Sequence, residues 1–252
     1  DLGTLYEEGL EDYDKALVYY QKASELARES GEHWSLAMAF LNEATIYAHL
    51  GEFDTAIELL KDVESQAEKI ENVYGSNSIM ALIQNRFGLV YHLKGQNEKA
   101  LDFYLKGYEL YVEYGDNDEV IAEYALSIGG IYKEIGNDEK AIEWCLLAHE
   151  ISQKNIYYAN LKKSCTCLYE VYDRIGDEGQ TLIYLKELKV VNDTLESRQS
   201  AKKVQQLEFS NQLRQDSIAQ AETDRLVLEA HQEEVKQKNK IRNILAGGGI
   251  LV

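Results

Sequence analysis

Apolar residues in the first two-thirds of the chain recur every three or four positions, the spacing of one face of a helix. One such face comprises Ala56, Ile57, Leu59, Leu60 and Val63, and another comprises Leu101, Tyr104 and Leu105. A half-buried strand would instead alternate apolar and polar residues. The pattern therefore predicts an all-α chain built from consecutive amphipathic helices.

Glycines divide this helical pattern at regular intervals. One series comprises Gly51, Gly95, Gly136 and Gly176, and a second, interleaved series comprises Gly31, Gly75, Gly115 and then Asn155. The spacing within each series is 40 to 44 residues. Glycine, and after it asparagine, readily adopts the left-handed conformation that ends a helix. The two series predict two turns per unit, with helices of about 14 to 18 residues between them.

Each unit also repeats a set of large and small residues. A tyrosine lies four residues before each glycine of the first series, at Tyr47, Tyr91, Tyr132 and Tyr172. Nine residues later come Ala56, Ala100, Ala141 and, in the last copy, Thr181, and four further on come Leu60, Tyr104, Cys145 and Leu185. Three residues before the tyrosines are Ala44, Gly88, Gly129 and Tyr169. Small residues at fixed places allow two helices to approach closely, while the large residue fills the space beside them.

This pattern resembles the tetratricopeptide repeat over about residues 1–195. The unit is longer than the usual 34 residues and closes on Gly or Asn instead of proline, as in the longer-helix branch of the family that includes kinesin light chains and bacterial peptide-sensing regulators. The resemblance implies a superhelix of about five helical hairpins, with a degenerate last copy as a cap. It also implies a non-enzymatic module that binds a peptide or protein ligand.

Composition narrows the possible partners and activities. The 252 residues include no proline and carry 44 acidic against 26 basic side chains, for a net charge of −18. This charge argues against nucleic acid as a partner, because phosphate contacts need clustered Lys and Arg. The sequence contains none of the motifs GxxxxGK, HExxH, GxGxxG, CxxC or GxSxG, so neither catalysis nor a cofactor is expected in this segment.

Histidine and cysteine give no sign of a metal site. The five histidines, His33, His49, His92, His149 and His231, are scattered, without a cysteine or carboxylate at metal-ligand spacing, and are expected to be packing or surface residues. The three cysteines, Cys145, Cys165 and Cys167, are odd in number, and the last two point in different directions on a helix. We expect buried thiols rather than a disulfide framework.

In tetratricopeptide superhelices the first helix of each pair lines the concave face, so helical spacing assigns the residues that face inward. The residues that helical spacing places on this inward face include Met38, Leu41, Thr45, Leu126 and Gly130. The predicted binding residues of the groove are Leu82, Asn85, Arg86, Leu89, His92, Lys133, Lys163, Thr166 and Glu170. The donors among them suit a peptide backbone or carboxylate. The alternative is that they are ordinary exposed positions on helices.

After Leu195 the glycines stop and Gln, Glu and Lys predominate. Residues 200–242 contain neither Gly nor Pro, which predicts one long helix, and we assign residues 196–243 to it. A heptad seam runs through Val204, Leu207, Asn211, Arg214, Ile218, Ala221, Arg225, Leu228, Gln232 and Val235. Its apolar members suit a parallel coiled-coil homodimer, and its polar members suit control of register. A surface helix folded back on the array is the alternative.

The last residues suggest contact with a membrane. Lys236, Lys238, Lys240 and Arg242 lie in a stretch without an acid, and residues 244–252 (ILAGGGILV) carry no polar side chain. A membrane span needs about 20 apolar residues, so this run is too short to cross alone. We expect it to be the start of a truncated transmembrane helix, with a frayed apolar tail as the alternative.

Two stretches, Leu207–Glu222 (LEFSNQLRQDSIAQAE) and His231–Gly249 (HQEEVKQKNKIRNILAGGG), are similar to the segment that joins repeats to membrane in bacterial receptors found chiefly in Bacteroidetes. Those receptors carry a periplasmic tetratricopeptide array, one helix through the inner membrane and a cytoplasmic output domain. The resemblance implies a sensor and transmission segment of such a receptor, most like those with a class III adenylate or guanylate cyclase output. A histidine kinase output and a soluble repeat scaffold are the alternatives. Basic residues before the apolar run would by themselves favour a cytoplasmic side.

Overall fold

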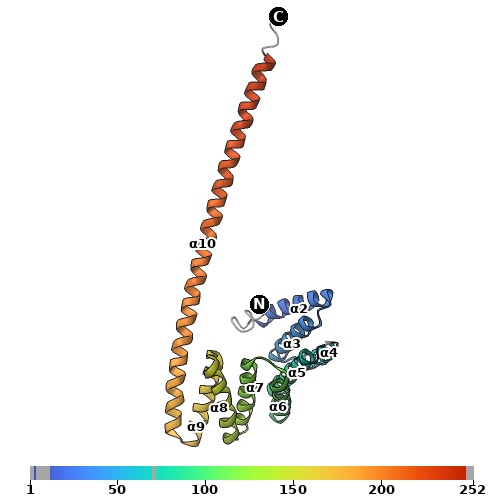
Figure 1. The fold of residues 1–252 in the computed structure, drawn as a ribbon, viewed down its shortest axis with the longest axis vertical. Helices are drawn as coiled ribbons and strands as arrows, with labels where there is room; N and C mark the ends of the chain where they lie inside the picture. Colours follow the sequence, from blue (N-terminus) through green and yellow to red (C-terminus); the bar gives the residue numbers. More distant parts are fainter. Residues whose placement is uncertain (1–2, 4–11, 70–71, 248–252) are drawn as a thin grey trace. The chain divides into compact units, whose positions relative to one another are not determined.

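The computed structural model describes residue 3 and residues 12–69 and 72–247, and over these residues the chain forms helices and turns without a strand. The helices are α2 (Tyr13–Ser30), α3 (His33–His49), α4 (Phe53–Ala67), α5 (Val73–Leu93), α6 (Asn97–Tyr114), α7 (Asp118–Glu134), α8 (Asp138–Asn155), α9 (Tyr158–Ile175) and α10 (Glu178–Gly247) (Figure 1). The prediction of an all-α chain is confirmed.

The helices pair in sequence order as hairpins. Helix α3 packs on α4, α5 on α6 and α7 on α8, each pair joined by a short turn (Figure 1). Helix α2 packs on α3, in the place of the second helix of a preceding pair. The start of α10 packs on α9 as the second helix of the last pair. At this contact the rings of Tyr172 of α9 and Tyr184 of α10 stack with centroids 5.7 Å apart. This arrangement confirms the predicted tetratricopeptide array.

Most glycines of the two series end helices as predicted. The backbone φ angle lies between 72° and 80° at Gly31, Gly51, Gly95, Gly136 and Gly176. Three positions of the second series differ: Gly75 lies inside α5, Gly115 follows α6 with an extended backbone, and Ile156 rather than Asn155 takes the left-handed conformation after α8. At the end of α6, Ser78 donates a hydrogen bond to the last carbonyl at 2.7 Å. A neighbouring helix therefore satisfies the last carbonyl of α6, where no left-handed residue follows.

The small residues of the repeat bring helices into close contact, as the sequence predicts. The alanines at these positions, Ala44, Ala56, Ala100 and Ala141, are fully buried. A Cβ atom on Gly88 would lie 2.7 Å from the ring of Tyr104, and one on Gly129 would lie 2.6 Å from the Sγ atom of Cys145. Such distances are shorter than any normal van der Waals contact, so these two positions require glycine.

The expectation that all three cysteines are thiols is wrong. Cys145 of α8 and Cys167 of α9 form a disulfide, and only Cys165 is a buried thiol. The two paired residues are 22 apart in sequence, but their Cα atoms lie 6.3 Å apart because the repeat packs α8 against α9. Whether two cysteines form a disulfide depends on the distance between their Cα atoms in the folded chain. The number and spacing of cysteines in the sequence do not reveal this distance.

Helix α10 continues from the last hairpin into the predicted long helix. Residues 195 and 196 lie inside α10, so the predicted boundary does not coincide with a helix end. By its contacts the chain divides into two compact units, Asp1–Asp193 and Thr194–Val252. Residues 248–252 of the apolar run lie outside the described residues. Within the described part of the chain, no helix combines the length and apolar content needed to cross a membrane.

Candidate binding site

A pocket of about 790 Å³ opens between α3, α5, the end of α6 and the start of α7. Its apolar lining includes Trp34, Met38, Leu41, Leu82 and Val120, and its polar lining includes Asn85, Arg86, Glu113, Asp116 and Glu123. Concave sites of this size, mostly apolar with a few polar groups, are typical of ligand-binding sites. The pocket therefore offers apolar contact area next to charges of both signs.

The turn between α6 and α7 closes one side of this pocket. Ser78 of α5 holds the end of α6 by its hydrogen bond to the carbonyl of Tyr114. Asn117 caps α7, since its side-chain oxygen accepts from the backbone nitrogen of Glu119 at 2.8 Å. These bonds fix the acid-bearing turn next to α5, so its carboxylates are presented at the pocket by the fold itself.

Two buried tyrosines near Arg86, Tyr104 and Tyr124, stay neutral. The hydroxyl of Tyr124 donates to the carbonyl of Ala81 at 2.6 Å, and its ring lies 6.0 Å from that of Tyr111. Burial raises the pKa of Tyr124 far above its usual range and the pKa of Tyr104 to about 12. Neither phenol contributes charge near neutral pH. Among the described residues that line the pocket, Arg86 is the only basic side chain.

The guanidinium of Arg86 donates to a neighbouring side chain and also has a buried nitrogen without an acceptor among the described residues. A terminal guanidinium nitrogen donates to the Oδ1 atom of Asn85 at 2.8 Å. The Nε atom is buried and has no hydrogen-bond acceptor among the described residues. A buried donor without a partner costs about 1–3 kcal/mol, and more when it is charged. An acceptor supplied by a ligand would relieve this cost.

The pocket brings together only part of the predicted groove. Of the predicted binding residues, Leu82, Asn85 and Arg86 line it, together with Met38 and Leu41. The others lie outside it along α5, α7 and α9, at Leu89, His92, Lys133, Lys163, Thr166 and Glu170. These six positions stay predictions.

Some of these outer residues form contacts between successive hairpins. The Nε2 atom of His92 on α5 lies 3.0 Å from a carboxylate oxygen of Glu134 on α7. The Nζ atom of Lys133 on α7 donates to Glu170 on α9 at 2.5 Å. Lys163 is exposed on α9. His92 and Lys133 therefore have partners within the array, which reduces their capacity to bind a ligand.

Sequence reasoning missed the acidic side of the pocket. Glu113 and Asp116 belong to the end of α6 and the turn after it, whereas the prediction considered only the first helix of each pair. The acidic residues around Gly115 are the signal that could have found this side. Which helix face they approach is a tertiary property.

A group of side chains that could hold a metal ion lies elsewhere. Within the described residues it comprises His149 of α8, Cys165 of α9 and Glu187 of α10. None of the three lines the pocket. The pocket and this cluster are therefore separate features of the array.

The fold defines a helical-repeat protein, and sequence comparison identifies its family. Residues 1–69 and 79–154, more than half of the chain, match the tetratricopeptide-repeat family. The chain belongs to this family, whose arrays are protein-binding scaffolds.

Individual relatives agree with this assignment. The 43 kDa receptor-associated protein of the synapse from Tetronarce californica is 29% identical over 188 residues, which cover 70% of this chain and 42% of the relative. The chain thus spans less than half the length of this curated relative. BtubC (BKLC) from P. vanneervenii has a TM-score of 0.63 at 17% identity, over 72% of this chain and 74% of its own. A Rap protein complexed with competence and sporulation factor has a TM-score of 0.57 at 11% identity, over 77% and 63%. At these identities the two structures establish the fold alone.

Proposed function

We propose that the array binds a peptide, or an extended segment of a protein partner, in the pocket between α3, α5, α6 and α7. The observation that carries the proposal is the buried Nε atom of Arg86, which has no acceptor among the described residues. A carbonyl or carboxylate oxygen of the ligand would accept this hydrogen bond. The side chains of Trp34 and Met38 would bury an adjacent apolar group of the ligand.

The charges around the pocket also favour one kind of peptide. Glu113, Asp116 and Glu123 line it together with the base Arg86. A ligand with a basic residue next to its apolar side chain would complement the acidic side, which favours specificity and rapid association. The similar Rap structure complexed with competence and sporulation factor supports ligand binding by this type of array.

The test uses a peptide selected on the whole chain from a random display library and labelled with a fluorophore. Arg86→Met should weaken binding at least about tenfold, because a hydrogen bond to a charged group contributes about 1.5–3 kcal/mol. Arg86→Lys, which keeps the charge but lacks the Nε donor, should also weaken binding. Lys61→Met removes an exposed charge on α4 and should bind as the wild type does. Fluorescence anisotropy measures all four affinities.

Equal affinities for Arg86→Met and Lys61→Met would contradict the pocket assignment, provided that circular dichroism shows both variants folded. A loss of affinity confined to Lys163→Met would place the ligand on α9 instead, next to the predicted contact Thr166. The two outcomes separate the pocket from the remainder of the predicted groove.

For the C-terminal part we propose a role in membrane-anchored signalling. In this proposal α10 pairs with the same helix of a second copy. The helix pair transmits the effect of ligand binding to an output domain. The resemblance of the C-terminal segments to those receptors favours a class III nucleotide cyclase as this domain. The support is the similarity of Leu207–Glu222 and His231–Gly249 to receptor segments, and the basic cluster followed by the apolar residues 244–252. Expression of the complete gene should yield a protein that requires detergent for extraction. Recovery in the soluble fraction would favour a soluble scaffold, and the encoded output domain would decide between cyclase and histidine kinase.

We also propose that the array lies in the periplasm, on the outer side of a bacterial inner membrane. The disulfide between Cys145 and Cys167 supports this side, because disulfides persist mainly in oxidising compartments. An alkaline phosphatase fused before Tyr13 should be active only if the array is exported. An inactive fusion of normal abundance would place the array in the cytoplasm.

A further inference from the structure

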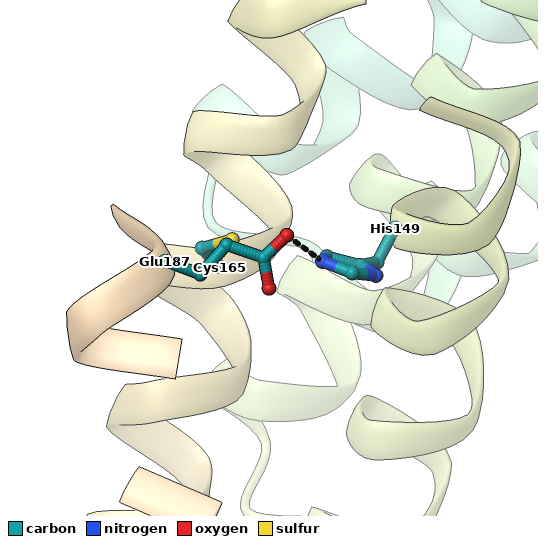
Figure 2. Close-up of side chains that lie close together, drawn as sticks. All are labelled: His149, Cys165 and Glu187. Carbon is teal, nitrogen blue, oxygen red and sulfur yellow. Dashed lines mark ion pairs between the residues drawn. The ribbon is translucent and has the colours of Figure 1, made fainter. Parts of the chain in front are cut away.

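Three side chains with metal-binding atoms meet where the last hairpin packs on α8, each from a different helix (Figure 2). An imidazole nitrogen of His149, the sulfur of Cys165 and a carboxylate oxygen of Glu187 all lie within 4.8 Å of one another. The Nε2 atom of His149 is 3.0 Å from the Glu187 carboxylate, which points toward the imidazole ring (Figure 2). Cysteine, histidine and glutamate thus converge on one point.

The cluster is largely closed to solvent. Cys165 is fully buried, His149 is 8% exposed, and the Glu187 side chain is 27% exposed at the edge. The ring of Tyr184 packs edge-on against His149 with centroids 5.6 Å apart. Although the Nε2 atom of His149 is close to Glu187, it is buried and has no partner in hydrogen-bond geometry among the described residues. The Nε2 atom and the Glu187 carboxylate thus face each other without a hydrogen bond between them, and a cation placed between them would take both as ligands.

Without a cation, the cluster places a neutral thiol beside a carboxylate. Burial, followed by the nearby Glu187 carboxylate, raises the pKa of the Cys165 thiol to about 12. A divalent cation would reverse both effects, since it attracts the carboxylate and favours the thiolate. On binding, the thiol would release its proton to solvent and the imidazole would bind in its neutral form.

We propose that His149, Cys165 and Glu187 bind a zinc-class divalent cation, with water as a fourth ligand. Nitrogen, sulfur and oxygen donors of these types are those that zinc takes in proteins, whereas calcium and magnesium take oxygen ligands. Zinc bonds of about 2.0–2.3 Å place tetrahedral ligand atoms about 3.3–3.8 Å apart. The His149 and Glu187 atoms are 3.0 Å apart and all three ligand atoms lie within 4.8 Å of one another, so small side-chain rotations would complete the site.

Such an ion would cross-link α8, α9 and the start of α10. Because the three ligands come together only in the folded chain, metal binding would stabilise the array. The site shares no residue with the pocket, so its test is independent of peptide binding.

The experiment uses the full chain purified without reductant. The disulfide then leaves Cys165 as the one thiol, so any thiolate signal belongs to it. Titration with Co²⁺ should produce a thiolate-to-cobalt charge-transfer band, which added Zn²⁺ should abolish by displacement. The melting temperature should rise with either ion.

Matched variants assign the ligands. Cys165→Ser should remove the charge-transfer band, and Glu187→Gln should weaken Co²⁺ binding at least about tenfold. The control is His92→Ala, which removes a histidine at the same 3.0 Å distance from a carboxylate but outside any metal-binding group of the described residues. It should bind Co²⁺ as the wild type does.

Absence of the band in the wild type, or an undiminished band in Cys165→Ser, would overturn the proposal. If Cys165→Ser does not fold, the partly exposed Glu187→Gln decides: an affinity equal to that of the wild type refutes the site, and a loss of at least about tenfold supports it.

Discussion

At the scale of single residues, two adjacent glycines of α7 differ in what surrounds them. A Cβ atom on Gly129 would lie 2.6 Å from the sulfur of Cys145, whereas one on Gly130 would meet no atom within 4 Å. Both glycines lose the same conformational entropy when the helix forms. Packing therefore requires glycine only at position 129. Comparing the two positions distinguishes the effect of close helix contact from the effect of helix propensity.

Alanine at these two positions should have opposite effects on the free energy of unfolding. Gly130→Ala should raise it by about 0.5–1 kcal/mol, because alanine loses less conformational entropy in a helix. Gly129→Ala should lower it by about 1–3 kcal/mol, because the extra methyl group pushes α7 away from α8. Urea denaturation of the full chain measures both values. Similar changes in the two variants would refute this account of the repeat's small positions.

A buried carboxylate in α3 makes stability depend on pH. Glu43 is 5% exposed, and one of its oxygens has no hydrogen-bond partner among the described residues. Burial raises the pKa of Glu43 above its ordinary value of 4.5, despite opposing effects of Ser24 and Arg28. Between these two pKa values the folded chain binds a proton that the unfolded chain lacks, so stability falls as pH rises through this window.

Glu43→Gln should therefore raise the melting temperature at neutral pH, since it removes a buried charge. The difference from the wild type should shrink as pH falls toward 4.5, where the native carboxyl group is already protonated in the folded state. Glu58→Gln, on the exposed face of α4, is the control and should change the melting temperature little at any pH. A constant difference between pH 4.5 and 8 would contradict the role of ionisation.

Sequence reasoning at this scale found residues but not their environments. Helical spacing selected Leu82, Asn85 and Arg86, which do share a pocket. It equally selected Lys133, which is paired with Glu170 of the next hairpin. Helical spacing assigns a face, but it does not show which side chain lies opposite.

At the scale of elements, α8 and α9 are joined covalently as well as by packing. The disulfide between Cys145 and Cys167 closes a loop of 22 residues and restricts the unfolded chain. A closed loop of this length is expected to contribute about 3 kcal/mol to stability. This contribution adds to the contacts that the repeat pattern predicts.

Reduction should lower the free energy of unfolding by about 3 kcal/mol. Denaturation with and without a phosphine reductant measures the effect. The double variant Cys145→Ala plus Cys167→Ala is the control, because the reductant should leave its stability unchanged. If the reductant destabilises this variant equally, its effect arises elsewhere than at the disulfide.

At the scale of the whole molecule, the region of α10 after residue 193 has many exposed apolar side chains. They include Val204, Leu207, Phe209, Leu226, Leu228, Val235 and Ile241. Helices in proteins gain most of their stability from packing an apolar face. The heptad positions Leu207 and Leu228 are therefore expected to pack against a second copy of this helix.

Sedimentation of the full chain should show a concentration-dependent dimer. Leu207→Lys plus Leu228→Lys should shift it to monomer, since two lysines would be buried at the seam. Phe209→Lys changes an equally exposed position off the seam and should remain dimeric. A wild-type monomer at high concentration would refute self-association through α10.

The sequence by itself determined the helices, the hairpin repeat and the small residues at close contacts. These properties depend on local conformation and on a spacing repeated along the chain, both of which are visible in one dimension. Only the tertiary structure decided the disulfide, the acidic side of the pocket and the meeting of His149, Cys165 and Glu187. Each of these depends on distances between side chains from different helices, which are set by how the helices pack and not by their order in the chain.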